Sequence, residues 1–116
     1  MLSERVYDLK ERTFKFAQRI LDIAEQLSRR PQCEIVRAQL AKAGTSIGAN
    51  VEEADGTITK KDFVNKMVIA RKEAKETGYW LRLISGRYIK EEEIASDIEE
   101  CQELIHILSS IINKSR

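Results

Sequence analysis

The chain has 116 residues, of which 42% are hydrophobic and 34% are charged, and its formal net charge at pH 7 is +1. This length and composition suit one ordered domain over residues 1–116 and argue against a disordered chain. No apolar run reaches the ~20 residues that a bilayer requires, so we do not expect a membrane span. The first residues lack the apolar segment of a signal peptide, and Cys33 and Cys101 fit no metal or redox spacing. We therefore expect a cytoplasmic protein with reduced thiols.

Four long amphipathic segments follow one another along the chain. Apolar side chains in steps of three and four predict helices over about 3–28, 32–55, 60–86 and 90–114, with Ser3 as the N-cap of the first. The links between these segments are short, so consecutive helices are expected to pack antiparallel. The sequence therefore predicts an all-α fold, an up-down-up-down four-helix bundle.

The second predicted helix contains the stretch AGTSIGANVEEADG, residues 43–56. Gly44 and Gly48 are four residues apart and share one flank, whereas Asn50 lies on the opposite flank. A glycine inside a helix costs roughly 1 kcal/mol relative to alanine, so we interpret the pair as a place where another helix approaches closely. Two alternatives remain open: that helix belongs to the same bundle, or the flank also meets another subunit.

The third predicted helix has a basic outer face. Residues 59–90 contain nine basic and three acidic residues, a net charge of +6. The basic stripe opposite its apolar seam consists of Lys61, Arg71, Lys72, Lys75, Tyr79 and Arg82. Basic side chains neutralise phosphates and a tyrosine stacks on bases, so this stripe is a candidate nucleic-acid surface. The alternative is a solvated face whose lysines pair with residues 91–116, where the net charge is −5.

Apolar side chains outside the helix seams predict self-association. They form a separate flank on the third helix and an extra stripe on the fourth, and apolar surface on two faces favours burial against another molecule. The predicted interface residues are Gly44, Gly48, Ile69, Trp80, Leu83, Leu104, Ile107 and Ile111. We therefore predict a homo-oligomer.

One pattern could carry chemistry. Glu103 and His106 form a Glu-x-x-His motif, which is half of the di-metal site in some four-helix bundles, but the chain has a single histidine. No nucleophile–base pair or phosphate-binding loop is readable. We predict a protein that is not an enzyme and has no cofactor, no metal and no small-molecule substrate; a metal-dependent bundle enzyme is the third alternative.

Two stretches resemble a known family. TSIGANVEEADG at 45–56 and KKDFVNKMVIARKEAKETGYWLRLI at 60–84 are similar to the small four-helix bundle proteins first associated with intervening sequences of bacterial large-subunit ribosomal RNA. Accessory proteins of diversity-generating retroelements resemble the same family. The resemblance implies a four-helix bundle, a homopentameric ring as in several members, no known catalysis, and a partner that is RNA or a nucleoprotein such as a reverse transcriptase complex.

These observations give two hypotheses for function. The first is an oligomeric scaffold or accessory protein that binds RNA, or a nucleic-acid enzyme, through the basic stripe. The alternative is a pure protein–protein interaction module, in which a partner helix docks on an apolar flank.

Overall fold

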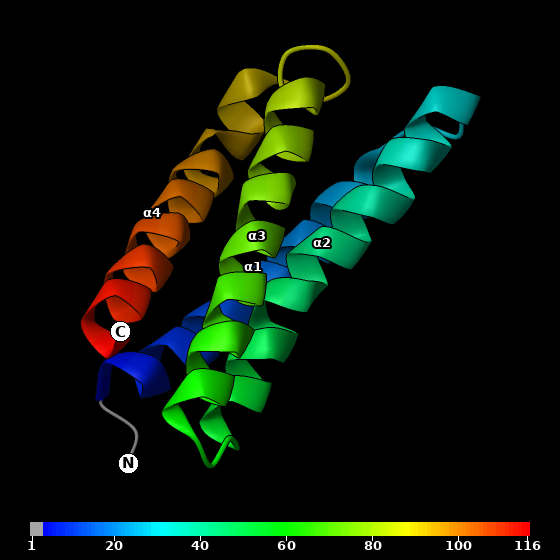
Figure 1. Ribbon diagram of the computed structural model, residues 1–116. Coiled ribbons are helices and arrows are strands. Elements are labelled where there is room, and N and C mark those ends of the chain that lie inside the picture. The colour runs from blue at the N-terminus through cyan, green and yellow to red at the C-terminus, as the bar shows by residue number, and fades with distance from the viewer. Residues whose placement is uncertain (1–3) are drawn as a thin grey trace.

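The computed structural model describes residues 4–116, which form four α-helices: α1 (Glu4–Gln26), α2 (Pro31–Asp55), α3 (Lys60–Ile84) and α4 (Glu91–Ser115). Figure 1 shows them running alternately up and down. The predicted all-α, up-down-up-down bundle is therefore confirmed. The predicted N-cap Ser3 lies outside the described residues.

The helix ends follow from local chemistry. The Thr59 side chain caps α3 by accepting a hydrogen bond of 3.1 Å from the amide of Asp62, which is one of the two bonds of a capping box. At its other end α3 stops at Ile84, two residues before the predicted end, because a tight turn follows. Gly86 adopts a φ of +77°, which glycine tolerates best, and its amide donates to the carbonyl of Ile89 at 2.7 Å.

A single apolar core runs along the bundle, which measures 45 × 23 × 19 Å. The four helices all contribute fully buried side chains to it, and the largest are Leu9, Ile20, Ile23, Leu40, Ile47, Met67, Leu81, Ile84, Ile94, Leu104, Leu108 and Ile112. Most of these residues lie on the seams that the apolar periodicity predicts. The core is therefore the feature of this protein that its sequence specifies most directly.

Gly44 and Gly48 of α2 lie directly against α1. A Cβ atom on Gly44 would lie 2.9 Å from Cβ of Ile20, and one on Gly48 would lie 3.2 Å from Oγ1 of Thr13. Both glycines are buried within the chain. The prediction of a close helix approach is confirmed, and the approaching helix belongs to the same bundle.

The extra apolar stripe of α4 also belongs to the bundle. Leu104 and Ile111 are buried in the core of the single chain, and Ile107 packs half-buried against it. An α-helix in a bundle contacts two neighbours, so it needs a wider apolar face than one seam. Gly44, Gly48, Leu104 and Ile111, which were predicted as interface residues, are buried within the single chain. They offer little surface to a second subunit, and the subunit interface itself stays a prediction.

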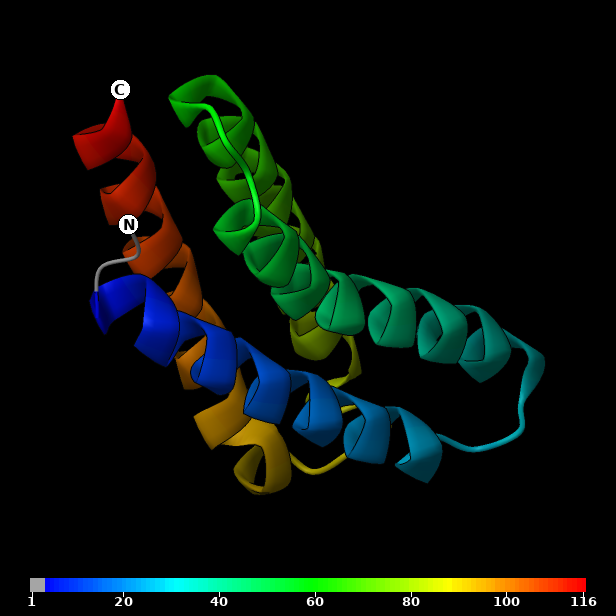
Figure 2. The same ribbon diagram turned by 90° about the horizontal axis from the view of Figure 1, so that it is seen from below.

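The four helices are not equally close to one another. Among neighbouring helices, α1 and α4 have the sparsest backbone contact. Figure 2 shows the antiparallel pair α1 and α2 lying across the antiparallel pair α3 and α4. The seam between α1 and α4 is consequently spanned by long side chains rather than by closely packed backbones.

We predict that Gly44→Ala lowers the free energy of unfolding, although alanine is the better helix former by about 1 kcal/mol. The new methyl group would overlap the buried, branched side chain of Ile20, and overpacking typically costs about 1–3 kcal/mol. The matched control is Gly78→Ala, whose Cβ would meet Sγ of Cys101 at an ordinary 3.4 Å. Urea unfolding should show a loss for the first variant and no loss for the second. Equal stability of the two variants would contradict the close approach.

Candidate nucleic-acid interface

The basic stripe lies on the outside of α3. Lys61, Lys72, Lys75 and Arg82 are exposed, and Arg71 at the edge is half-buried. Arg71 donates a hydrogen bond of 3.4 Å from Nη1 to Oγ of Ser109 on α4. The helical spacing thus brings the predicted cationic residues onto one accessible face.

Within residues 4–116, none of these five cations forms an ion pair with a carboxylate. Arg82 turns its Nε back to the carbonyl of Gly78 in its own helix, at 3.3 Å. Of the alternative interpretation, the pairing with α4 is thus not seen for these five residues in the described chain, while the exposure of the stripe is that of a solvated face. Elsewhere on α3, Lys66 pairs with Glu53 of α2 at 2.7 Å, whereas the cations of the basic stripe have no carboxylate in direct contact within residues 4–116.

The carboxylates of α4 are engaged by α1 instead. Arg12 makes two hydrogen bonds to Glu100, of 2.7 and 2.8 Å, and Arg19 Nε bonds Oδ1 of Asp97 at 2.9 Å. Arg19 also reaches the carbonyl of Glu93 at 3.1 Å. The hydrogen bond with Glu100 raises the pKa of Arg12, and that with Asp97 raises the pKa of Arg19. These pairs close the seam between α1 and α4.

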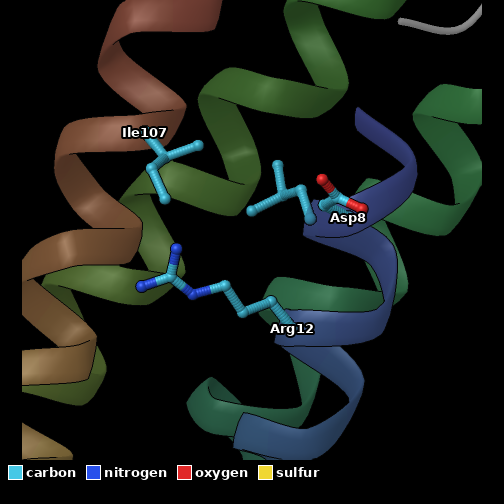
Figure 3. A pocket seen from close by; sticks show the side chains of 4 residues that line it. Asp8, Arg12 and Ile107 are labelled. Atoms are coloured by element: carbon cyan, nitrogen blue, oxygen red, sulfur yellow. The ribbon is translucent and has the colours of Figure 1, made fainter. Parts of the chain in front are cut away.

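A small groove of about 250 Å³ lies in the same seam, beside Arg12. It is lined by Asp8, Leu9, Arg12 and Ile107. Figure 3 shows Arg12 extending from α1 across to α4, with Ile107 on the far side of the groove. The side chain of Arg12 is committed to Glu100, so the groove is a gap in the ion-paired seam, on a different face from the basic stripe.

Aromatic and apolar residues flank the basic stripe. Tyr79 is exposed and meets Trp80 edge to face, with ring centroids 5.1 Å apart. Trp80 is half-buried and donates from Nε1 to Glu76 at 3.3 Å, which fixes its ring. Ile69 is 40% exposed and Leu83 is 43% exposed. Of the predicted interface residues, Ile69 and Leu83 on α3 are thus the most accessible.

The structure also exposes apolar residues that the sequence analysis missed. Phe14 on α1 is 59% exposed and Leu21 is 49% exposed; Ile35 and Ile58 are exposed as well. Phe14 and Leu21 are seven residues apart, which places them on one stripe beside the buried seam. This seven-residue spacing of apolar side chains, outside the buried seam of α1, is the sequence signal that would have revealed Phe14 and Leu21.

The residues with possible chemistry differ in burial: Cys101 is buried, whereas Glu103 and His106 are exposed. Cys101 is buried and its Sγ donates to the carbonyl of Ala74 at 3.1 Å, and burial raises the pKa of this thiol to about 12. Glu103 and His106 are both exposed, as expected. In the described part of the chain there is no cluster of three or more metal-ligating side chains, and no helix has both the length and the apolar character needed to cross a membrane.

A model of the family described as 23S rRNA-intervening sequence protein matches residues 5–110. The chain belongs to this family. The family resemblance seen in the sequence is thereby confirmed, and the match covers all but the outermost turns of the bundle.

A solved structure supports the same assignment. The crystal structure of a protein of unknown function from the S23 ribosomal protein family of Bacteroides thetaiotaomicron is 36% identical in sequence to this member of the 23S rRNA-intervening sequence family. The two superpose with a TM-score of 0.86, over 94% of this chain and 98% of the other. Among curated proteins none matches this chain.

Proposed function

We propose that this member of the 23S rRNA-intervening sequence family is a non-catalytic scaffold that binds RNA along the outer face of α3. The observation that carries the proposal is the absence of ion pairs at Lys61, Lys72, Lys75 and Arg82 in the described chain, although acidic residues are abundant on α4. Cations that have no counter-charge in the folded chain are available to neutralise phosphates.

The proposed binding is electrostatic and tolerant of sequence. Phosphate contacts from lysine and arginine position a nucleic acid without reading its bases. Tyr79, exposed among the cations, supplies one ring on which a base can stack. The stripe follows the convex outside of a helix and offers no groove for base edges, so single-stranded or loop RNA is the expected ligand.

Self-association completes this proposal. One chain offers only a few phosphate contacts, and a ring repeats the same stripe and gains avidity without new contacts. A ring needs two different patches on each chain. The exposed flank of α3 at Ile69 and Leu83 and the α1 stripe of Phe14 and Leu21 are two such patches. The family resemblance favours a ring of five subunits.

A second candidate function is supported by the same exposed flank. Ile69 and Leu83 present apolar surface that a helix of another protein, such as a nucleic-acid enzyme, would cover. In that case binding is dominated by apolar contacts and is insensitive to salt. The response of binding to salt therefore separates the two functions.

We predict that replacing Lys72, Lys75 and Arg82 with Glu abolishes RNA binding, because the stripe changes from attraction to repulsion of phosphates. These residues are exposed and form no ion pair in residues 4–116, so helicity and thermal stability should stay close to those of the wild type. Fluorescence anisotropy with a labelled single-stranded RNA at two salt concentrations measures the effect. The matched control is Lys42→Glu on the exposed outside of α2, which should bind nearly as well as the wild type. If the triple variant binds RNA as the wild type does, the stripe is not the binding surface.

We predict that the protein sediments as a closed homo-oligomer and that Leu83→Glu dissociates it, since a buried unpaired charge strongly disfavours an apolar interface. Phe14→Glu should do the same if α1 provides the second patch. Analytical ultracentrifugation at micromolar concentration provides the measurement, with the exposed Glu99→Gln as a control that should keep the wild-type mass. A wild-type sedimentation mass of 13.3 kDa, that of one chain, would rule the oligomer out.

A further inference from the structure

Two turns that lie far apart in the sequence meet at one end of the bundle. Residues 27–30 join α1 to α2, and residues 85–90 join α3 to α4. Arg30 from the first turn lies over the ring of Tyr88 from the second, with Cζ 5.1 Å from the ring centroid. Arg87 lies over the same ring at 5.6 Å. A tyrosine ring that contacts two guanidinium groups holds them in place by cation–π attraction.

Both guanidinium groups keep most of their hydrogen-bonding capacity. Arg30 donates from Nε to Oγ of Ser28 at 3.1 Å, and Arg87 donates from Nε to the hydroxyl of Tyr88 at 3.4 Å. The Nη groups of these two arginines have no protein partner in the described residues. By contrast, Arg12 and Arg19 use both Nε and Nη2 to bind groups on α4. Arg30 and Arg87 are therefore held in place by the Tyr88 ring, while their Nη groups remain available to a ligand.

The nearby acidic residues do not neutralise this pair. Glu34 is bound by Arg37, whose Nη1 lies 2.8 Å from its carboxylate. Glu91 begins α4 and lies beside Gly86, yet it forms no ion pair with Arg87.

The turn that carries Arg30 is itself fixed. Arg37 on α2 donates from Nη2 to the carbonyls of Leu27, at 2.8 Å, and Ser28. These bonds satisfy carbonyls at the end of α1 and hold the turn against α2. The backbone that carries Arg30 is thus held by the fold, and its exposed side chain contacts Ser28 and Tyr88.

We propose that Arg30 and Arg87, held on the ring of Tyr88, form a phosphate-binding site for the backbone of single-stranded RNA. The planar guanidinium offers paired N–H donors that match the oxygens of a phosphate. The site extends the basic stripe, since Arg82 lies in the last turn of α3, just before the turn that carries Arg87. This inference rests on the proposed RNA-binding function and adds a second contact at the end of the bundle.

The salt dependence of RNA binding tests this site. For single strands, each phosphate contact contributes about −0.7 to the slope of log K against log salt, so each lost contact makes the slope shallower by about 0.7. For the variant Arg30→Ala/Arg87→Ala, the slope measured by anisotropy with a labelled single-stranded RNA should therefore be shallower than that of the wild type by about 1.4. The control Lys114→Ala/Arg116→Ala removes the same charge near the C-terminus, at the opposite end of the bundle in Figure 1. It should keep the wild-type slope.

The outcomes separate this inference from the proposed function. If the α3 triple Glu variant loses binding and the Arg30→Ala/Arg87→Ala variant equals its control, the proposed function stands and the second site is overturned. If only Arg30→Ala/Arg87→Ala loses binding, the site stands and the α3 surface is overturned. Wild-type protein that binds no RNA at low salt would overturn both. Displacement of the RNA by millimolar inorganic phosphate at constant ionic strength would assign the site to a free phosphate and overturn the RNA assignment.

Discussion

The guanidinium–carboxylate pairs between α1 and α4 determine which charged side chains of this molecule are left without an ion-pair partner. Arg12 and Arg19 bind Glu100 and Asp97 across the seam where the backbones are least close. The side chain of Asp97 is only 9% exposed, and its Oδ2 has no hydrogen-bond partner within residues 4–116. Loss of Arg19 would leave this buried carboxylate without compensation, which costs far more than an exposed pair contributes. The α1–α4 pairing is therefore strongly constrained.

This constraint has a consequence on the opposite side of the bundle. The carboxylates of Glu100 and Asp97 are bound by α1. The stripe cations of α3, which are Lys61, Lys72, Lys75 and Arg82, form no ion pair in the described chain, whereas Lys66 pairs with Glu53 of α2. A near-neutral protein thus presents a basic face, although its net charge at pH 7 is only +1. Charge at this surface acts over about a Debye length, roughly 8–10 Å at physiological salt, so a local stripe matters more to a phosphate backbone than the total charge does.

Periodicity was sufficient to predict the helices, most of the core and the basic stripe from the sequence. The glycine pair was also predictable, because Gly44 and Gly48 carry a cost in helix stability that only close packing explains. The rotation of α4 about its own axis was not predictable. From the sequence, Leu104 and Ile111 look like a second, exposed apolar face, but both are buried in the structure. A helix in a bundle has two neighbours, and apolar spacing alone does not tell a wide core face from an exposed patch.

Contacts between distant residues were the other part that sequence patterns could not supply. The pairs of Arg12 with Glu100 and of Arg19 with Asp97 join opposite ends of the chain, and no local signal marks them. The same is true of Arg30 and Tyr88, which come together only because two turns lie at one end of the bundle. Binding surfaces of this kind become visible only when the fold brings the turns together.

The most direct test of this account is a pair of double-mutant cycles measured by urea unfolding. One cycle combines Arg12→Ala with Glu100→Ala, and the other combines Arg82→Ala with Glu100→Ala. We expect a coupling free energy of about 0.5–1 kcal/mol for Arg12 with Glu100, as for a well-aligned, partly exposed pair, and none beyond about 0.3 kcal/mol for Arg82 with Glu100. A coupling for Arg82 that equals or exceeds that of Arg12 would show that α4 neutralises α3, and would contradict the account.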